Sequence, residues 1–375
     1  MNKSTLPTRL LALAAAVATA ATVAVGGASS AEAAKRPTST DVSSAKPALS
    51  AEAKAAGAAK FGPAATESQT LEAYWTPERM RAAKPAEDDT ALASAATAYV
   101  QKQQADQKAG RKPVTNDGPV RSADGVASKV FGSASTAGGF AAAYNPNLPY
   151  YVPTAYTAGK VFFSKPDGNY VCSGTIVNSE GKDTVWTAGH CVHGGSGGTW
   201  HTNWTFVPAY DDDLANPRPY GTWSANQLWS KSAWTGSSDF SQDMGVAIMN
   251  TNWGWHIVDY FGGQGLTTNR GKSGVWENAF GYPAESPFDG GNLMQCWGST
   301  SPEWDAWFVW SQTVKIPCDM TRGSSGGGWL YGYNGNWGQL NGVNSRIDRI
   351  VGPTIMLSPY FDDDAWGLFN STRYL

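Results

Sequence analysis

Two short stretches decide how this chain folds and what it can do: Thr187-Ala188-Gly189-His190-Cys191 and Gly323-Ser324-Ser325-Gly326-Gly327. A hydroxyl that attacks an amide or ester carbonyl needs a base of near-neutral pKa and donors for the oxyanion that forms. His190 can supply the base and Ser325, 135 positions later, the hydroxyl. The backbone N–H groups of Gly323 and Ser325 can form the oxyanion hole, because glycine lets the backbone turn an N–H inward. Together the stretches predict a serine hydrolase.

A carboxylate should complete the site by orienting the imidazole and stabilising its charged form. We predict Asp243 in this role, because it precedes the short apolar run 244–249, which is typical of a buried strand. A carboxylate at the mouth of such a strand needs a partner, and His190 would be that partner. Asp239 is the alternative, but it lies in a Gly/Ser-rich loop that would hold it less rigidly.

Other serine hydrolases place the same groups in a different order along the chain. The pattern Gly323-x-Ser325-x-Gly327 also fits the nucleophile elbow of an α/β-hydrolase, which needs its histidine after the serine. That interpretation fails because all four histidines precede Ser325: His190, His193, His201 and His256. A subtilisin order needs an aspartate before His190, and Asp183 is a poorly placed candidate for it.

The chain contains four motifs in a fixed order: Cys172-Ser173-Gly174-Thr175-Ile176-Val177, Thr187-Ala188-Gly189-His190-Cys191, Asp243-Met244-Gly245-Val246-Ala247 and Gly323-Ser324-Ser325-Gly326-Gly327. This set resembles a chymotrypsin-type (trypsin-like) serine protease of the bacterial secreted kind, over about residues 150–375. The resemblance implies an all-β fold of two antiparallel six-stranded barrels, with the active site in the cleft between them. The first barrel would carry His190 and Asp243, and the second Ser325.

The pattern of short apolar runs between Gly, Pro, Asn and Asp turns independently favours a β-sandwich or β-barrels. The runs that predict strands are 159–164, 170–178, 184–187, 204–208, 243–250, 275–281, 308–316, 338–343 and 354–358.

The cysteines allow three pairings. The resemblance implies a disulfide between Cys172 and Cys191, which leaves Cys296 and Cys318 to close a loop before the nucleophile. Cys191, His190 and His193 lack the spacing of a zinc site, so we expect no metal and no cofactor. The acidic runs 211–213 and 362–364 are typical of solvated loops, with calcium binding as the alternative.

The resemblance also suggests which residues contact the substrate. It implies that Ser345 hydrogen-bonds Asp243 and lines the substrate groove. Asp319 lies six residues before Ser325, where trypsin keeps the aspartate that binds Lys or Arg, and would favour a basic side chain by charge pairing. The cysteine of this loop is displaced relative to trypsin, so the alignment can shift by a residue. The preferred substrate side chain is therefore left unassigned.

Two neighbouring residues depart from related proteases. Ser324 stands where trypsin has an aspartate that pairs with the freed N-terminus, so that activation switch is not expected. Asn344 stands where glutamyl-specific relatives have a histidine, so specificity for glutamate is not supported.

The N-terminus has the pattern of a secretory signal peptide, predicted over residues 1–33. Lys3 and Arg9 form its positively charged start. The apolar stretch from Leu10 to Val25 follows, and it is too short and too Ala-rich for a membrane anchor. The net charge of −3 gives no electrostatic reason to expect nucleic-acid binding. We expect a secreted, extracellular monomer that acts on protein or peptide substrates and is not attached to a membrane.

Residues 34–146 differ in composition from the domain predicted over 147–375. They are rich in Ala, Lys, Gln, Ser and Asp, which suggests a pro-region, with a plain linker as the alternative. Thr76 and Pro77 predict a helix start and Thr90–Lys108 a second helix, while the remainder is predicted to be loop or disorder.

The leading hypothesis is therefore a secreted serine endopeptidase that works through an acyl-enzyme. The alternative is a catalytically inactive protease-like module that binds surface polymers through its aromatic residues. The combination of His190, Asp243 and Ser325 favours the enzyme, because a binding module does not need all three.

Overall fold

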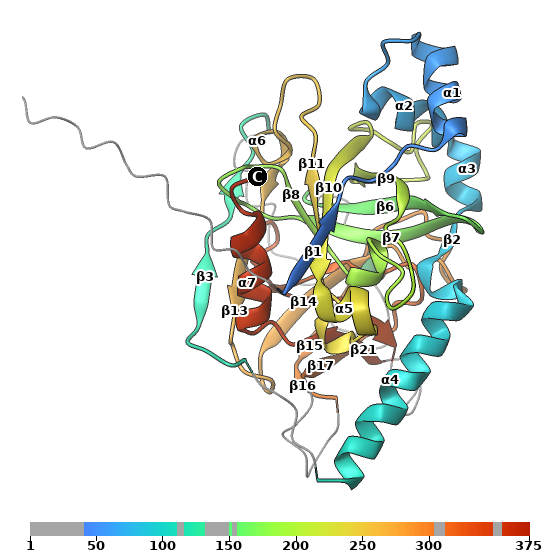
Figure 1. The fold of residues 1–375 in the computed structure, drawn as a ribbon. Coiled ribbons are helices and arrows are strands. Elements are labelled where there is room, and N and C mark those ends of the chain that lie inside the picture. The colour runs from blue at the N-terminus through green and yellow to red at the C-terminus, as the bar shows by residue number, and fades with distance from the viewer. Residues whose placement is uncertain (1–40, 111–115, 132–149, 152–155, 304–311, 348–354) are drawn as a thin grey trace, which may run out of the picture. The chain divides into compact units, whose positions relative to one another are not determined.

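Six antiparallel strands close into a barrel that carries His190 just after the end of one strand (Figure 1). The computed structural model describes residues 41–110, 116–131, 150–151, 156–303, 312–347 and 355–375. All of them lie in one compact unit, Pro37–Leu375. The strands pair in the order β10-β11-β8-β7-β6-β9, and β9 pairs back with β10. They are β6 (Ala158–Lys165), β7 (Gly168–Ile176), β8 (Thr184–Thr187), β9 (Thr202–Pro208), β10 (Trp223–Lys231) and β11 (Gly245–Met249).

Strand β6 is buried along nearly its whole length instead of alternating between core and solvent. Its Val161, Phe162 and Phe163 are of residue types that favour strands, and all three are fully buried. The outer side is covered by the N-terminal segment, since the Trp75 ring lies 5.4 Å from that of Phe162. The Trp75 indole also donates to the Asn203 carbonyl at 2.9 Å, which satisfies its buried N–H.

A second sheet system carries Ser325. Its main sheet runs β3-β13-β19-β18-β14-β15-β5, and a smaller sheet runs β16-β17-β21-β20. The expected all-β, two-barrel architecture is confirmed. The strands are β3 (Arg121–Ala123), β5 (Tyr150–Tyr151), β13 (Gly265–Thr268), β14 (Trp276–Gly281), β15 (Met294–Ser299), β16 (Ser301–Pro302), β17 (Thr313–Pro317), β18 (Gly328–Tyr331), β19 (Gln339–Val343), β20 (Arg346–Ile347) and β21 (Ile355–Pro359). A separate pair joins β4 (Val126–Ala127) to β12 (Gly262–Gly263).

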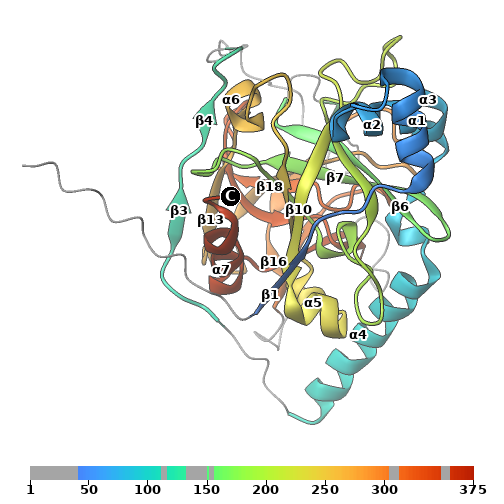
Figure 2. The same cartoon turned by 45° about the horizontal axis from the view of Figure 1, so that its top comes forward.

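The described residues 41–110 form more regular structure than the sequence suggested, and for them the prediction of loop or disorder outside the two expected helices was wrong. Strand β1 (Val42–Ala45) extends the first sheet by pairing with β10. Capped helices follow, and β2 (Lys84–Pro85) pairs in parallel with β7. Figure 2 shows the long helix α4, which ends this helical part of the chain before β3 and β4. The helices are α1 (Ala51–Phe61), α2 (Glu67–Tyr74), α3 (Pro77–Ala82) and α4 (Thr90–Lys108), with the short 3-10 helix η1 (Ala86–Asp88) before α4.

The two helices predicted in this segment both form, each with an identifiable cap. The Thr76 side chain accepts the Arg79 N–H and Pro77 opens α3. Helix α4 begins and ends at the predicted residues, and the Asp89 side chain caps it by accepting the Ala91 N–H at 2.8 Å. In the described part of the chain, no helix combines the length and apolarity that a membrane span requires.

One acidic run was misinterpreted. Asp362–Asp364 was expected to be a solvated loop, but it starts the C-terminal helix α7 (Asp363–Thr372), with the Asp362 side chain accepting the Asp364 N–H. Asp363 pairs with Arg121, and Asp364 pairs with Lys231. Carboxylates at a helix N-terminus are stabilised by the helix dipole, which explains the cluster without a bound ion.

Glu277, in β14, is fully buried, and burial raises its pKa to about 8, although an Asn341 hydrogen bond of 2.7 Å and the Arg270 charge oppose the shift. Between about pH 4.5 and about pH 8 the folded chain thus holds a proton that the unfolded chain has lost. We expect stability to fall as pH rises through this window, by at most about 5 kcal/mol from this group. The test is urea unfolding measured from pH 5 to pH 8.5. The urea concentration at half-unfolding should fall less with pH in Glu277→Gln than in the wild type, whereas the exposed control Glu78→Gln should behave like the wild type. An unchanged slope in Glu277→Gln would contradict this.

Candidate active site

The loop that carries Ser325 packs directly against the end of β8, which brings it to the histidine loop. Gly326 has φ +82°, and a Cβ there would lie 2.0 Å from the Thr187 Oγ1 and 2.5 Å from the Ser173 carbonyl. Only glycine permits this conformation and this approach together. The Ser173 N–H donates to the Ser325 carbonyl at 2.6 Å, which fixes the loop against β7. The spacing of glycines around Ser325 therefore serves to join the two halves of the site.

Asp243 holds His190 through both of its oxygens. Its Oδ1 accepts the His190 backbone N–H at 2.8 Å, and its Oδ2 lies 2.8 Å from the His190 Nδ1. The Ser345 hydroxyl, just after β19, donates to the same Oδ2 at 2.6 Å. Asp243 is fully buried and Ser345 nearly so, so these bonds are shielded from water. One carboxylate thus orients the imidazole and links the barrel to the second sheet system.

The rival carboxylates are engaged elsewhere. Asp239 accepts the N–H and hydroxyl of Ser241 at the start of a 3-10 helix. Asp183 lies 2.6 Å from the Nδ1 of His256 and accepts the Ile257 N–H.

Ser325 does not meet the imidazole in this structure. Its hydroxyl donates to the carboxylate of Glu87, which belongs to the N-terminal segment. The Gly323 N–H reaches the same carboxylate at 3.2 Å. Among the described residues, the buried Nε2 of His190 has no hydrogen-bond partner. The Glu87 carboxylate therefore binds both the Ser325 hydroxyl and the Gly323 N–H, while the Nε2 of His190 is left unpaired among the described residues.

The electrostatic environment of His190 favours its charged form. Burial on its own would lower the imidazole pKa, but the charge and hydrogen bond of Asp243 and the charge of Glu87 raise it, and the net pKa is raised. His201 behaves in the opposite way: burial lowers its pKa to about 3, so it stays neutral. Its Nε2 lies 2.9 Å from the His190 carbonyl and braces the loop from behind.

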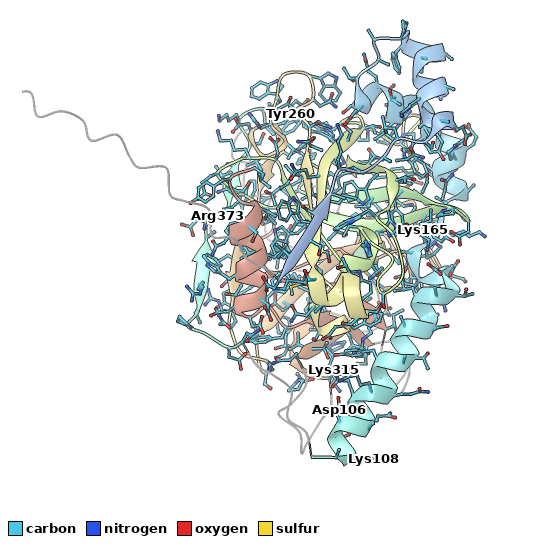
Figure 3. The ribbon with its side chains drawn as sticks, viewed as in Figure 1. Asp106, Lys108, Lys165, Tyr260, Lys315 and Arg373 are labelled. Carbon is cyan, nitrogen blue, oxygen red and sulfur yellow. A yellow bond between two sulfur atoms is a disulfide. The ribbon has the colours of Figure 1, made fainter. Side chains whose placement is uncertain are left out.

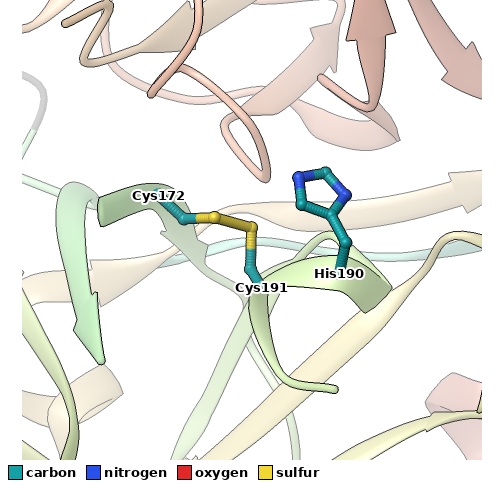
Figure 4. Close-up of side chains that lie close together, drawn as sticks. All are labelled: Cys172, His190 and Cys191. Carbon is teal, nitrogen blue, oxygen red and sulfur yellow. A yellow bond between two sulfur atoms is a disulfide. The ribbon is translucent and has the colours of Figure 1, made fainter. Parts of the chain in front are cut away.

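Disulfides join the expected pairs, Cys172–Cys191 and Cys296–Cys318. The first ties β7 to the loop of His190 (Figure 4). A ring nitrogen of His190 and the two sulfurs of this bridge lie within 4.8 Å of one another. Because both sulfurs are consumed by the bridge, no thiolate remains there to bind a metal.

The two residues considered for substrate specificity occupy different settings. Asp319 is partly buried; its Oδ1 has no partner among the described residues, and burial raises its pKa despite a backbone hydrogen bond. It is not among the residues that line the cavity beside Ser325 and Ser345. Asn344 is fully buried and bonded to Phe280, Ser324 and Trp329, so it supports the nucleophile loop.

Three residues in or near this site were not predicted from the sequence: Glu87, Arg322 and Lys165. Arg322 pairs with Asp88 at 2.9 Å, and Lys165, at the end of β6 (Figure 3), pairs with Asp89. The available signal was the acidic run Glu87-Asp88-Asp89 immediately before a helix. Nothing in the sequence indicates that this run lies beside a serine more than 200 positions away.

Solved structures resemble this chain. A protease, Anisep, from Arthrobacter nicotinovorans is 36% identical with a TM-score of 0.56, and the match covers 61% of this chain and 100% of that one. A thermostable serine protease, AL20, from an extremophilic microorganism is 36% identical with a TM-score of 0.53, over 58% of this chain and 97% of that one. No protein-family model and no curated protein matches the chain.

Proposed function

Because the chain belongs to the bacterial chymotrypsin-fold serine proteases, we propose that it is a secreted endopeptidase that cleaves peptide bonds through His190, Asp243 and Ser325. The observation that carries the proposal is the double contact of Asp243 with His190, at 2.8 Å to the ring and 2.8 Å to the backbone. A purely structural histidine does not need a buried carboxylate that fixes both its ring and its loop.

In the proposed reaction, Ser325 attacks the substrate carbonyl while His190 accepts the hydroxyl proton at Nε2. The tetrahedral oxyanion is stabilised by the backbone N–H groups of Gly323 and Ser325, and its collapse expels the amine, which takes the proton from His190. Water then enters, gives a proton to His190 and attacks the acyl-enzyme; the bond to the Ser325 oxygen breaks, that oxygen takes the proton back from His190, and the acid is released. Asp243 keeps the Nδ1 proton in place throughout, so that Nε2 is free to accept.

We further propose that residues 34–146 are a pro-region. The matched protease from Arthrobacter nicotinovorans is covered completely by 61% of this chain, which leaves room for an additional segment. The contacts of Glu87 with Ser325 and Gly323 support an interaction with the site in preference to a plain linker. The two disulfides and the signal-like N-terminus support export to an oxidising compartment.

Asp319 remains the proposed contact for a substrate side chain. Its Oδ1 is buried without a partner in the part of the chain that the structure describes. A buried carboxylate in this state gains most from a cationic partner, such as a lysine or arginine side chain.

The raised pKa of His190 leads to a pH prediction for the intact chain. Modification of Ser325 should slow as the pH falls through this pKa, above 6.5, because imidazolium cannot accept the proton. Removing the Glu87 charge should move the midpoint to lower pH. The measurement is the pH dependence of fluorophosphonate labelling in the wild type, Glu87→Gln and the exposed control Glu78→Gln. Coincident midpoints in all three would contradict the assignment.

Active-site labelling also tests the proposed function itself. The protein is incubated with a fluorophosphonate, and the modified residue is identified by mass spectrometry, with His190→Ala as the control. Labelling of Ser325 that disappears in His190→Ala establishes an activated nucleophile. If Ser325 stays unlabelled after residues 34–146 have been removed, the enzyme hypothesis is overturned and the binding module remains.

A further inference from the structure

We propose that the face around Ser325 is a binding site for three consecutive carboxylates, filled in the intact chain by Glu87, Asp88 and Asp89, which hold the nucleophile unreactive. The inference rests on the proposed function and identifies what occupies that same site. Each acidic side chain has its own partner: Glu87 the Ser325 hydroxyl and Gly323 N–H, Asp88 the Arg322 guanidinium, and Asp89 the Lys165 ammonium.

The contact between Glu87 and Ser325 blocks the serine and cannot lead to cleavage. Ser325 faces a side-chain carboxylate, which is a poor electrophile because its negative charge is shared by both oxygens. The hydroxyl proton is donated to this carboxylate, so it is not directed at His190. The Nε2 of His190 correspondingly lacks a partner among the described residues, although it is buried. Glu87 thus separates the nucleophile from its base and occupies the Gly323 donor.

Two cations match the two following carboxylates: Arg322, three residues before Ser325 in the chain, and Lys165, whose charge acts on His190. Arg322 is adjacent to Gly323 in the chain and lies 2.9 Å from Asp88, with a more distant contact of 3.7 Å to Glu285. Lys165 is 12% exposed, lies 4.3 Å above the Tyr170 ring and pairs with Asp89, which is 18% exposed. A partly buried pair is screened less by salt than a surface pair, so the Lys165 contact contributes more than a surface ion pair does.

The acidic run is anchored on both sides. Before it, Lys84 and Pro85 pair with Tyr170 and Val171 of β7. After it, Asp89 caps α4, whose Leu92 and Tyr99 pack into a small apolar cluster with Trp234 and Phe240.

Residues of α4 also form one wall of a cavity that is lined by Glu87, Phe240, Ser325 and Ser345. Glu87 is therefore anchored by the pairing of β2 with β7 before it and by the packing of α4 after it, which lowers the ordering cost of its contact with Ser325.

The same arrangement defines the ligand that the site would accept once the segment has left. Removing Glu87, Asp88 and Asp89 frees the Gly323 N–H and Arg322 beside Ser325, and it frees Lys165, which pairs with Asp89. Complementary charges guide partner choice and orientation. The ligand class is accordingly a peptide with adjacent acidic side chains, and the chain's own segment is the first such ligand.

The experiment measures the second-order rate of fluorophosphonate labelling of the uncut chain, resolved from any shortened product on a gel. We expect Glu87→Ala and Glu87→Gln to label faster than the wild type, by about 10- to 100-fold, since a hydrogen bond to a charged group is lost or weakened. Glu78→Gln, an exposed glutamate of the same segment, is the matched control and should label at the wild-type rate. Thermal unfolding of each variant establishes that the fold is retained.

Equal and measurable rates in the wild type and both Glu87 variants would overturn the inference while leaving the nucleophile intact. No labelling of any uncut variant would also overturn the inference, whereas the proposed function would fall only if Ser325 stayed unlabelled after removal of residues 34–146.

A double-mutant cycle on Asp88→Asn and Arg322→Gln tests the flanking pair. Asp88→Asn alone should raise the labelling rate several-fold, and the same change should have little further effect in an Arg322→Gln background. Additive effects would show that the two residues act separately and would remove Arg322 from the proposed site.

Discussion

Replacing Ser325 with alanine is expected to lower kcat on a peptide substrate by about 10⁶-fold. The hydroxyl would be the only group that bonds covalently to the substrate, and its loss leaves only the oxyanion donors and substrate binding to assist water. His190→Ala should cost a similar factor, and the double variant no more than either single one, because nucleophile and base work as a unit. The measurement is hydrolysis of a fluorogenic peptide library by protein freed of residues 34–146.

Ser324→Ala is the matched control for this prediction. Ser324 neighbours the nucleophile and is also buried, but its hydroxyl donates to the Thr321 carbonyl at 2.8 Å and has no role in the proposed chemistry. We expect it to retain activity within about tenfold of the wild type, since only one local hydrogen bond is lost. Activity in Ser325→Ala within about 100-fold of the wild type would contradict the assignment, because an indispensable nucleophile leaves far less.

The sequence predicted the parts of this fold whose determinants are local. Helix α4 was placed correctly because its cap and length are encoded in neighbouring residues. Strands such as β8 were found because short apolar runs between turns are distinctive. Strands β10, β13, β15 and β18 were missed: β10, for example, contains Ser, Asn, Gln and Lys without a regular apolar alternation, and its pairing on both edges makes it a strand.

The order of the N-terminal segment could not be predicted from its own composition. Helices α1 and α2 are short and only weakly amphipathic, and isolated helices of this length are marginal in water. They are held by contacts with residues more than 100 positions away, such as the Ser68 hydroxyl on that of Ser224 at 3.0 Å. Residues 308–311 of one predicted strand lie outside the described residues, and that strand begins at Thr313 in the structure.

In the candidate site, too, some residues could be predicted from the sequence and others could not. Residue type and order sufficed to select His190, Asp243 and Ser325, since each stands in a recognisable small-residue or strand-end context. The placement of Glu87 against Ser325 depends on β2 pairing with β7, and parallel pairing of a two-residue strand leaves no periodicity to detect. The site is thus encoded locally, whereas its occupant is placed by tertiary structure.

Asp243→Asn is expected to lower kcat by about 10⁴-fold while leaving the geometry of the site largely unchanged, an effect known for the equivalent change in trypsin. The hydrogen-bond network decides which way the new amide points. Its carbonyl must accept the His190 backbone N–H, so its NH₂ group faces the His190 Nδ1 and the Ser345 hydroxyl. An NH₂ donor at Nδ1 forces the imidazole proton onto Nε2. That nitrogen then cannot accept a proton from Ser325, although every heavy atom stays in place.

Asp239→Asn is the control, because Asp239 is the nearest rival carboxylate and differs from Asp243 in what it touches. Its side chain accepts only from Ser241 among the hydrogen bonds described, so the change should leave kcat within about tenfold of the wild type. Comparable losses in both variants would mean that negative charge near the site matters and the His190 tautomer does not. A loss confined to Asp243→Asn assigns the effect to the contacts of Asp243 with His190 and Ser345, since Asp239→Asn removes the same charge from a side chain that touches neither.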